Sequence, residues 1–274
     1  MTQGASIEAN GFAIPLVGLG TWMLRGRECA RLVQQAIRLG YRHIDTAQMY
    51  DNEREVGEGV RASGKRSDVI VTTKVQPTLL APHDLDRSVK ESLAKLRLDH
   101  IDLLLIHWPN PRVPLVETLG AMAKMKQAGY ARALGVSNFT IALLDEANKV
   151  SPEPLVCNQI ECHPYLDQHQ VIDACNRHGL AVIAYSPIAR GGAKGDEVLE
   201  RIGKAHKKSA AQVSLRFLVQ QGIAVIPRTS RIERLEENIS IFDFALSDEE
   251  MAEIHGLARR GGRIVDWTWS PKWD

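Results

Sequence analysis

The chain has 274 residues, of which 44% are hydrophobic and 24% are charged, the composition of an ordinary globular protein. A net charge of +1 gives no overall attraction to nucleic acid or to a membrane surface, so any basic binding site must be local. No apolar run approaches the ~20 residues that cross a bilayer and the N-terminus lacks a signal-peptide pattern, so we expect a cytoplasmic protein that binds neither nucleic acid nor membrane.

The first predicted element is a β-hairpin. Asn10-Gly11 lies between Ile7 and the apolar run from Phe12 to Ile14, and Asn-Gly is favoured at the tip of a two-residue hairpin turn. We expect this hairpin to have a structural role.

A short strand from Leu16 to Leu19 follows and ends at Gly20-Thr21-Trp22. The pair Gly18-x-Gly20 could begin a dinucleotide-binding fingerprint, but Met23 stands where the third glycine belongs. The sequence therefore argues against a Rossmann-type nucleotide site at this point.

Helix-like and strand-like segments then alternate along the chain. Apolar residues at helical spacing, such as Cys29, Val33 and Ile37, precede apolar or β-branched runs of strand length. Strands are predicted over residues 16–19, 41–44, 69–73, 101–106, 133–136, 156–160, 181–185 and 223–226. Eight strands separated by helices predict an α/β fold of the (β/α)8 TIM barrel type. Since no polar linker or composition shift interrupts the pattern, we expect a single domain over residues 1–274.

The four cysteines do not form a spaced disulfide framework. Cys29, Cys157, Cys162 and Cys175 fall in predicted helices and strands, where they are expected to be reduced and buried. The pair Cys162-His163 could supply half of a metal site, but no second pair at ligand spacing accompanies it. We therefore predict that the protein has no metal site.

Ionisable residues follow the ends of three neighbouring predicted strands. Asp45 ends the second strand and Tyr50 comes five residues later, Lys74 ends the third strand and His107 ends the fourth. Asp45 could instead cap a helix, Tyr50 could be a packing residue, and His107 could be a hydrogen-bonded histidine at a strand end. Because the carboxyl ends of barrel strands meet at one rim, however, the four groups are expected to converge where TIM barrels carry their active sites.

These four residues occur in the order of the proton-donor tetrad of the aldo-keto reductases, a family that the chain resembles from about Val17 to its C-terminus. The stretch from Gly40 to Gly57 follows the first signature of that family. Two further stretches resemble its other motifs: Arg132-Ala133-Leu134-Gly135-Val136-Ser137-Asn138-Phe139, and Ile226-Pro227-Arg228-Thr229 followed by Arg234, Glu237 and Asn238. The resemblance implies a TIM barrel whose bottom is closed by the N-terminal hairpin, with a short C-terminal helix and tail.

The resemblance also implies carbonyl reduction, which needs a hydride for carbon and a proton for oxygen. A nicotinamide supplies the hydride, and Tyr50 would supply the proton. We expect Lys74 to lower the pKa of Tyr50 and Asp45 to hold the Lys74 ammonium by a charge-assisted hydrogen bond. His107 would orient the carbonyl group and stabilise developing negative charge on its oxygen.

Residues for the cofactor are implied around the same rim. Ser137, Asn138 and Gln159 suit a carboxamide, and Tyr185 offers a ring face for the nicotinamide. The other residues assigned to the cofactor are Gly20, Thr21, Trp22, Asp45, Ser186, Ile188, Gly191, Arg228, Thr229, Arg234, Glu237 and Asn238. Arginine matches phosphate geometry, so Arg228 and Arg234 favour a 2′-phosphate and hence NADPH/NADP, although the family more often has Lys-Ser at Arg228-Thr229. Taken singly, each polar residue of the set could instead cap a loop.

The glycine-rich loop from Ile188 to Gly195 is a candidate lid. The C-terminal tail, which follows the predicted helix beginning at Ser247, is rich in tryptophan. Trp267, Trp269 and Trp273 could be packing residues or could form the wall of a substrate pocket. The resemblance favours a pocket for a small carbonyl substrate lined by Trp22, Tyr50, His107, Trp108 and Trp267.

Within the family, the motifs around Asp45 and His107 are most similar to those of bacterial reductases of 2,5-diketo-D-gluconate, which also reduce methylglyoxal. We therefore predict a monomeric NADPH-dependent reductase of activated dicarbonyl compounds. One alternative is a non-enzymatic relative that binds NADPH as a sensor or regulatory subunit, and another is a metal-dependent TIM-barrel enzyme.

Overall fold

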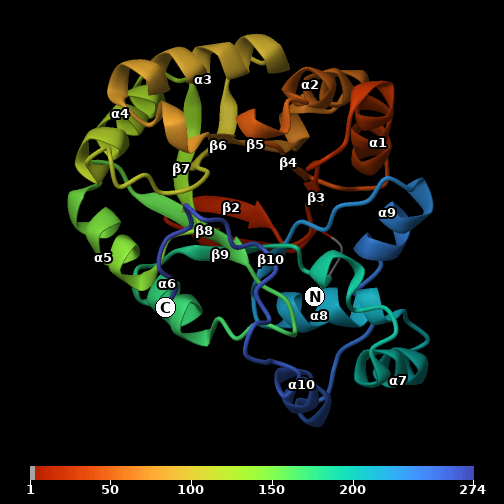
Figure 1. Ribbon diagram of the computed structural model, residues 1–274. Helices are drawn as coiled ribbons and strands as arrows, with labels where there is room; N and C mark the ends of the chain where they lie inside the picture. Colours follow the sequence, from red (N-terminus) through yellow and green to blue (C-terminus); the bar gives the residue numbers. More distant parts are fainter. Residues whose placement is uncertain (1–3) are drawn as a thin grey trace.

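The computed structural model describes residues 4–274, so the first three residues of the predicted domain lie outside it. Eight parallel strands form one sheet in the order β10-β9-β8-β7-β6-β5-β4-β3. Parallel bridges between Val17 and Val225 and between Gly20 and Arg228 join the two ends of this sheet. Figure 1 shows the resulting ring of strands with helices around it. The predicted TIM barrel is therefore confirmed.

The strands and helices alternate as the sequence pattern predicts, with additional helices before β10 and after α9. The strands are β1 Ser6–Ala9, β2 Phe12–Pro15, β3 Leu19–Gly20, β4 His43–Asp45, β5 Ile70–Val75, β6 Ile101–Ile106, β7 Ala131–Ser137, β8 Leu155–Glu161, β9 Ala181–Tyr185 and β10 Ala224–Val225. The α-helices are α1 Gly26–Arg38, α2 Glu53–Ala62, α3 Pro82–Leu96, α4 Leu115–Gln127, α5 Ile141–Val150, α6 His169–Arg177, α7 Glu197–His206, α8 Ala210–Gln220, α9 Ile232–Ile239 and α10 Asp248–His255. The 3-10 helices are η1 Gln48–Tyr50, η2 Arg66–Asp68, η3 Pro77–Leu79 and η4 Ala189–Gly191.

The N-terminal hairpin is present and lies across the barrel (Figure 1). Strands β1 and β2 pair antiparallel around Asn10 and Gly11, whose positive φ angles of 47° and 75° suit a primed two-residue turn. Ala9 and Ile14 of the hairpin belong to the same buried apolar cluster as the inward-facing residues of the barrel strands. The hairpin therefore adds its apolar side chains to the barrel core and leaves the opposite end of the barrel for the site.

Strand alternation separates two apolar cores. Leu103 and Leu105 of β6, with Ile183 of β9, belong to the small cluster inside the barrel. Leu104 and Ile106 of β6 belong to a larger cluster between the barrel and its helices. A parallel strand that is buried on both faces needs an almost continuous apolar sequence, as β6 has.

The first two predicted strands begin two or three residues later in the structure. The first was predicted from Leu16, but only Leu19–Gly20 forms a regular strand, and the preceding residues make single bonds to the last strand, such as Gly18 N–H to the Val225 carbonyl at 2.8 Å. The second was predicted from Tyr41 and begins at His43. Tyr41 is still buried, and its hydroxyl donates to the carbonyl of Leu235 at 2.8 Å.

All four cysteines are buried and none forms a disulfide, as predicted. Burial raises the pKa of Cys29, Cys162 and Cys175 to about 12 each. Within residues 4–274, no three metal-ligating side chains gather in one place. Over the same part of the chain, every helix is too short or too polar to traverse a bilayer.

Candidate active site

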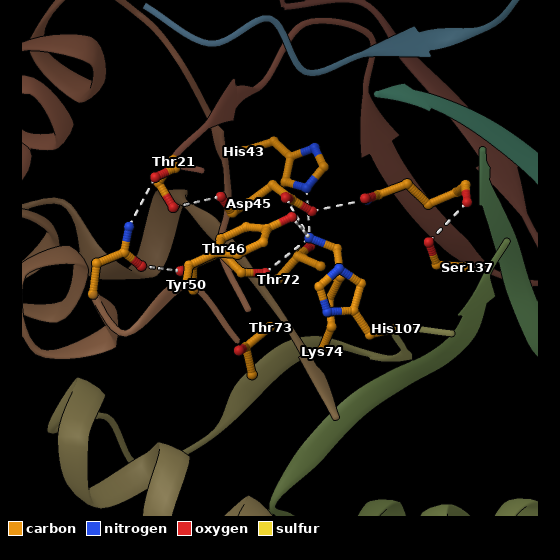
Figure 2. A network of polar contacts seen from close by, with 12 residues as sticks. Thr21, His43, Asp45, Thr46, Tyr50, Thr72, Thr73, Lys74, His107 and Ser137 are labelled. Carbon is orange, nitrogen blue, oxygen red and sulfur yellow. Dashed lines mark hydrogen bonds and ion pairs between the residues drawn. The ribbon is translucent and has the colours of Figure 1, made fainter. Parts of the chain in front are cut away.

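The structure brings the four predicted catalytic residues together at the carboxyl end of the strands. Lys74 Nζ lies 2.5 Å from Asp45 Oδ1, and it also donates to the Thr46 carbonyl at 2.9 Å and to the Tyr50 hydroxyl at 3.4 Å. The rings of Tyr50 and His107 meet edge to face with centroids 5.5 Å apart. Figure 2 shows these side chains pointing toward one another.

Strand register explains why Asp45 and Lys74 meet. In the β4–β5 ladder, Asp45 pairs with Thr72, and Lys74 stands two residues further along β5 on the same inward face. His43 lies two residues before Asp45 on that face and contacts the Thr72 hydroxyl through Nε2 at 2.9 Å. The Asp45–Lys74 pair thus lies above a buried polar layer.

The backbone around Tyr50 is held by Asn52, which the sequence analysis did not identify. The Asn52 amide donates to the carbonyls of Thr21 at 2.8 Å and Leu24 at 3.0 Å, and its oxygen accepts from the Thr46 hydroxyl at 2.7 Å. Asn52 therefore ties the loop after β3 to the loop that carries Tyr50. Its only sequence signal was its place within the stretch from Gly40 to Gly57, because Thr21 and Leu24 are distant from it in the chain.

Burial dominates the electrostatics of the tetrad. It lowers the pKa of Lys74, while Asp45 acts in the opposite direction. Burial raises the pKa of Tyr50 well above 10, with Asp45 as a second cause. Burial and the nearby Lys74 charge hold the pKa of His107 well below 6.5. The pKa of Tyr50 in the free protein is therefore raised and not lowered as predicted, because burial, with Asp45 as a second cause, outweighs the effect of the nearby Lys74.

A second group of polar side chains lies on the other side of the tetrad. The Tyr185 hydroxyl donates to Asn138 Oδ1 at 2.8 Å, and the Asn138 amide donates to the His107 carbonyl at 3.0 Å. The Gln159 amide donates to Asp45 Oδ2 at 2.8 Å. Asp45 therefore binds Lys74 with one oxygen and Gln159 with the other, which links the two groups.

A cavity of about 600 Å³ opens over both groups, a size typical of a ligand site. Most of the predicted site residues line it: Gly20, Trp22, Asp45, Tyr50, His107, Trp108, Ser137, Asn138, Gln159, Tyr185, Ser186, Ile188, Gly191, Arg228, Arg234 and Trp267. Lys74 lies behind Tyr50. A side chain at Gly20 would come within 2.7 Å of the Ile226 carbonyl, so only glycine allows this part of the wall.

Four of the predicted cofactor residues lie outside the lining of this cavity. Thr21 is buried and its hydroxyl donates to the Asp45 carbonyl at 2.9 Å, while the Thr229 hydroxyl contacts the backbone of Arg231. The Glu237 carboxylate accepts a hydrogen bond from Ser209, and Asn238 is buried. The assignment of these four residues to the cofactor, like that of the residues that line the cavity, remains a prediction.

The Aldo/keto reductase family matches residues 16–259. The chain belongs to the aldo-keto reductase family. It is therefore an oxidoreductase, and its similarity to reductases supports carbonyl reduction with a nicotinamide cofactor.

Named relatives of this aldo-keto reductase match it along nearly its whole length. Methylglyoxal reductase DkgB of Escherichia coli O157:H7 is 40% identical over 266 residues, which are 96% of this chain and 100% of that protein. Glyoxal reductase of Bacillus subtilis (strain 168) is 40% identical over 250 residues, 90% of each chain. A crystal structure provisionally assigned as a 2,5-diketo-D-gluconic acid reductase B is 46% identical, covers 99% of each chain and superposes with a TM-score of 0.97.

The aldo-keto reductase cavity also includes residues that the sequence analysis did not assign to it. They are Met23, Met49, Pro187, Arg190, Ile226, Val265 and Trp269. Trp269 was one of the tail tryptophans whose role was left open, and Arg190 lies in the loop predicted as a candidate lid. The Arg190 guanidinium stands over the Trp22 ring, 4.7 Å from its centre. Val265 carried no signal, because one apolar residue in a tail has no distinguishing pattern.

Proposed function

We propose that this protein reduces activated carbonyl compounds with NADPH and that Tyr50 donates the proton. The observation that supports this most directly is the hydrogen bond from Lys74 Nζ to the Tyr50 hydroxyl at 3.4 Å, beside the buried Asp45–Lys74 pair. A phenol that lines a cavity and touches a lysine has a partner for the charge that appears when its proton leaves.

The protein residues divide the work of the reaction. The nicotinamide supplies hydride to the carbonyl carbon. Tyr50 holds its proton at neutral pH, because burial raises its pKa, and transfers it to the oxygen as negative charge develops there. His107 is neutral, because burial lowers its pKa, and a neutral imidazole can donate a hydrogen bond to the same oxygen without adding charge. Lys74 then stabilises the phenolate.

The cavity suits a nicotinamide nucleotide. Asn138, Gln159 and Ser137 present amide and hydroxyl groups to the cavity, and Tyr185 lines it beside them. Neither Arg228 nor Arg234 is paired with a carboxylate of residues 4–274, although both line the cavity. Two unpaired guanidinium groups favour a phosphate ligand, and we propose that they bind the 2′-phosphate of NADPH.

The substrate side of the cavity is aromatic and thioether-rich. Trp22, Trp108 and Trp267 line it with Met23 and Met49. Such surface suits small carbonyl compounds. By similarity to the reductases named above, we propose methylglyoxal, glyoxal and 2,5-diketo-D-gluconate as the substrate class.

Mixing the purified protein with NADPH and methylglyoxal tests the proposal. We expect NADPH absorbance to fall as the carbonyl is reduced. A protein that binds NADPH but leaves it unoxidised with each of the three compounds would contradict the proposal and support the non-enzymatic alternative.

A further inference from the structure

The C-terminal tail forms the outer wall of the cavity. After α10 ends at His255, residues 256–274 contain no helix or strand, yet Val265, Trp267 and Trp269 line the cavity. Trp267 and Trp269 are about half exposed, so their own burial holds them only in part. Other contacts must also hold this segment over the site.

The side chain of Glu161, at the end of β8, holds the tail by its backbone. Glu161 Oε1 accepts the N–H of Ile264 at 2.7 Å, and Oε2 accepts the N–H of Val265 at 2.8 Å. One carboxylate thus binds two consecutive peptide groups, just before the tail tryptophans. Charge-assisted hydrogen bonds of this kind are about twice as strong as neutral ones.

The site requires a carboxylate rather than an amide. A third partner, His163 Nε2, lies 3.0 Å from Glu161 Oε1, and both side chains are fully buried. The other ring nitrogen of His163 accepts the N–H of Tyr165 at 3.3 Å, so Nε2 is the nitrogen that carries hydrogen. All three partners of Glu161 are therefore donors, and the NH₂ group of a glutamine would face at least one of them.

The tail also docks on the turn that follows Glu161. Arg259 N–H donates to the Tyr165 carbonyl at 3.3 Å, and a Cβ at Gly262 would lie 1.8 Å from that same oxygen. Only glycine permits this approach of the two backbones. The approach places the N–H groups of Ile264 and Val265 beside the Glu161 carboxylate. Residues 161–165 and 259–265 therefore form one interface.

The position of the tail determines the wall opposite the tetrad. The ring of Trp269 meets that of Trp108 edge to face at 5.0 Å, and Trp108 follows His107 directly. Glu161 itself does not line the cavity, so its influence on a substrate must pass through the tail.

We propose that Glu161 is a positioning residue that holds the C-terminal tail as the wall of the substrate site and so sets the KM for substrates large enough to reach it. This inference rests on the proposed function for its kinetic consequence. A three-carbon substrate at Tyr50 and His107 would be affected little, whereas an aromatic aldehyde that extends toward Trp267 and Trp269 would bind less well once the tail is released.

The variant Glu161→Gln tests this, with Glu117→Gln on the exposed first turn of α4 as the control for loss of one charge. For nitrobenzaldehyde we expect KM to rise about tenfold in Glu161→Gln, the size of one lost hydrogen bond to a charged group, with kcat nearly unchanged. For methylglyoxal both constants should stay close to those of the control. Equal losses for the two substrates, or a loss confined to kcat, would overturn the proposal.

A second measurement needs no substrate. Trypsin should cut Glu161→Gln after Arg260 and Arg263 faster than it cuts the wild type or Glu117→Gln, because the released tail is accessible to protease. Cleavage at the wild-type rate would overturn the proposal whatever the kinetics. If the wild type reduced no carbonyl compound at all, the proposed function would fail, while the protease result would still decide whether Glu161 holds the tail.

Discussion

Lys74 donates to the hydroxyl of Tyr50 across 3.4 Å, yet its much shorter contact, 2.5 Å, is with the buried carboxylate of Asp45. The lysine charge is therefore already compensated before the phenol ionises. Burial then keeps the Tyr50 proton in place, with a pKa well above 10. Such a group acts as an acid only when strong negative charge develops next to it, which describes the oxygen of a carbonyl that receives hydride.

Replacing Tyr50 by phenylalanine should abolish carbonyl reduction while leaving NADPH binding intact. The ring that shapes the cavity remains, and only the acid is removed. Positioned acid catalysis is typically worth about 10² to 10⁴-fold, so kcat with methylglyoxal should fall by at least 10²-fold. Tyr130→Phe, which removes a phenol outside the cavity lining, is the matched control. If Tyr50→Phe kept more than about a tenth of the activity, Tyr50 would not be the proton donor.

Removing Arg228 or Arg234 should weaken NADPH binding far more than NADH binding. Both line the cavity and neither is paired with a carboxylate among the described residues, so a 2′-phosphate would be their counter-ion. Hydrogen bonds to charged groups are worth roughly 1.5 to 3 kcal/mol, which predicts a loss of about 10 to 150-fold for NADPH in Arg228→Ala and Arg234→Ala. Titration of the protein with each nucleotide, followed by protein fluorescence, measures the two affinities. The variant Arg31→Ala, at an exposed position, is the control. Equal losses for NADPH and NADH would show that these arginines do not recognise the 2′-phosphate.

The buried layer beneath the tetrad predicts a loss of stability in acid. Burial lowers the pKa of His43 to about 4, against about 6.5 for an unfolded histidine. As the pH falls from about 6.5 toward 4, the unfolded chain binds a proton at His43 that the folded chain does not, so the free energy of unfolding decreases. The full difference between the folded and unfolded pKa values of His43 corresponds to a loss of roughly 3 kcal/mol in the free energy of unfolding.

Denaturant unfolding at about pH 7 and about pH 5 measures this effect. His43→Gln, whose amide can still bond to Thr72, should show a smaller loss between the two pH values than the wild type. His83→Gln should behave as the wild type, because the His83 side chain is 91% exposed. The explanation would fail if all three proteins lost the same free energy.

The convergence of the four tetrad residues could be predicted from the sequence because they lie at or soon after the ends of successive strands, and the family resemblance supplied their expected roles. The hydrogen bonds of Glu161 to the tail could not, since they join residues 103 and 104 positions apart and neither partner belongs to a recognisable motif. The contacts of Asn52 with Thr21 and Leu24 could not be predicted either, although Asn52 lies within the first signature, because they depend on how two loops meet. The pKa of Tyr50 was misjudged because the sequence shows which charges are near but not how much each is buried or already paired.

Substrate preference is the remaining prediction. The substrate side of the cavity offers indole, thioether and phenol surface. Among residues 4–274 the one carboxylate that lines the cavity, Asp45, is already bound to Lys74 and Gln159. A hydroxylated sugar would exchange its hydration for this surface with few hydrogen bonds in return. A second carbonyl group, by contrast, withdraws electrons from the target carbon and makes it a better hydride acceptor. We therefore expect methylglyoxal and 2,5-diketo-D-gluconate to be reduced with a higher kcat/KM than xylose.

Steady-state kinetics with the three compounds at saturating NADPH test this preference directly. The comparison of methylglyoxal with xylose matters most, because both are uncharged and differ in activation and in the number of hydroxyl groups. A simple unactivated aldehyde such as propanal separates those two causes: if activation decides, propanal should be a poor substrate like xylose, and if hydroxyl groups decide, it should resemble methylglyoxal. A clear preference for xylose over methylglyoxal would contradict the assignment of the substrate class and leave only the general activity of an aldo-keto reductase.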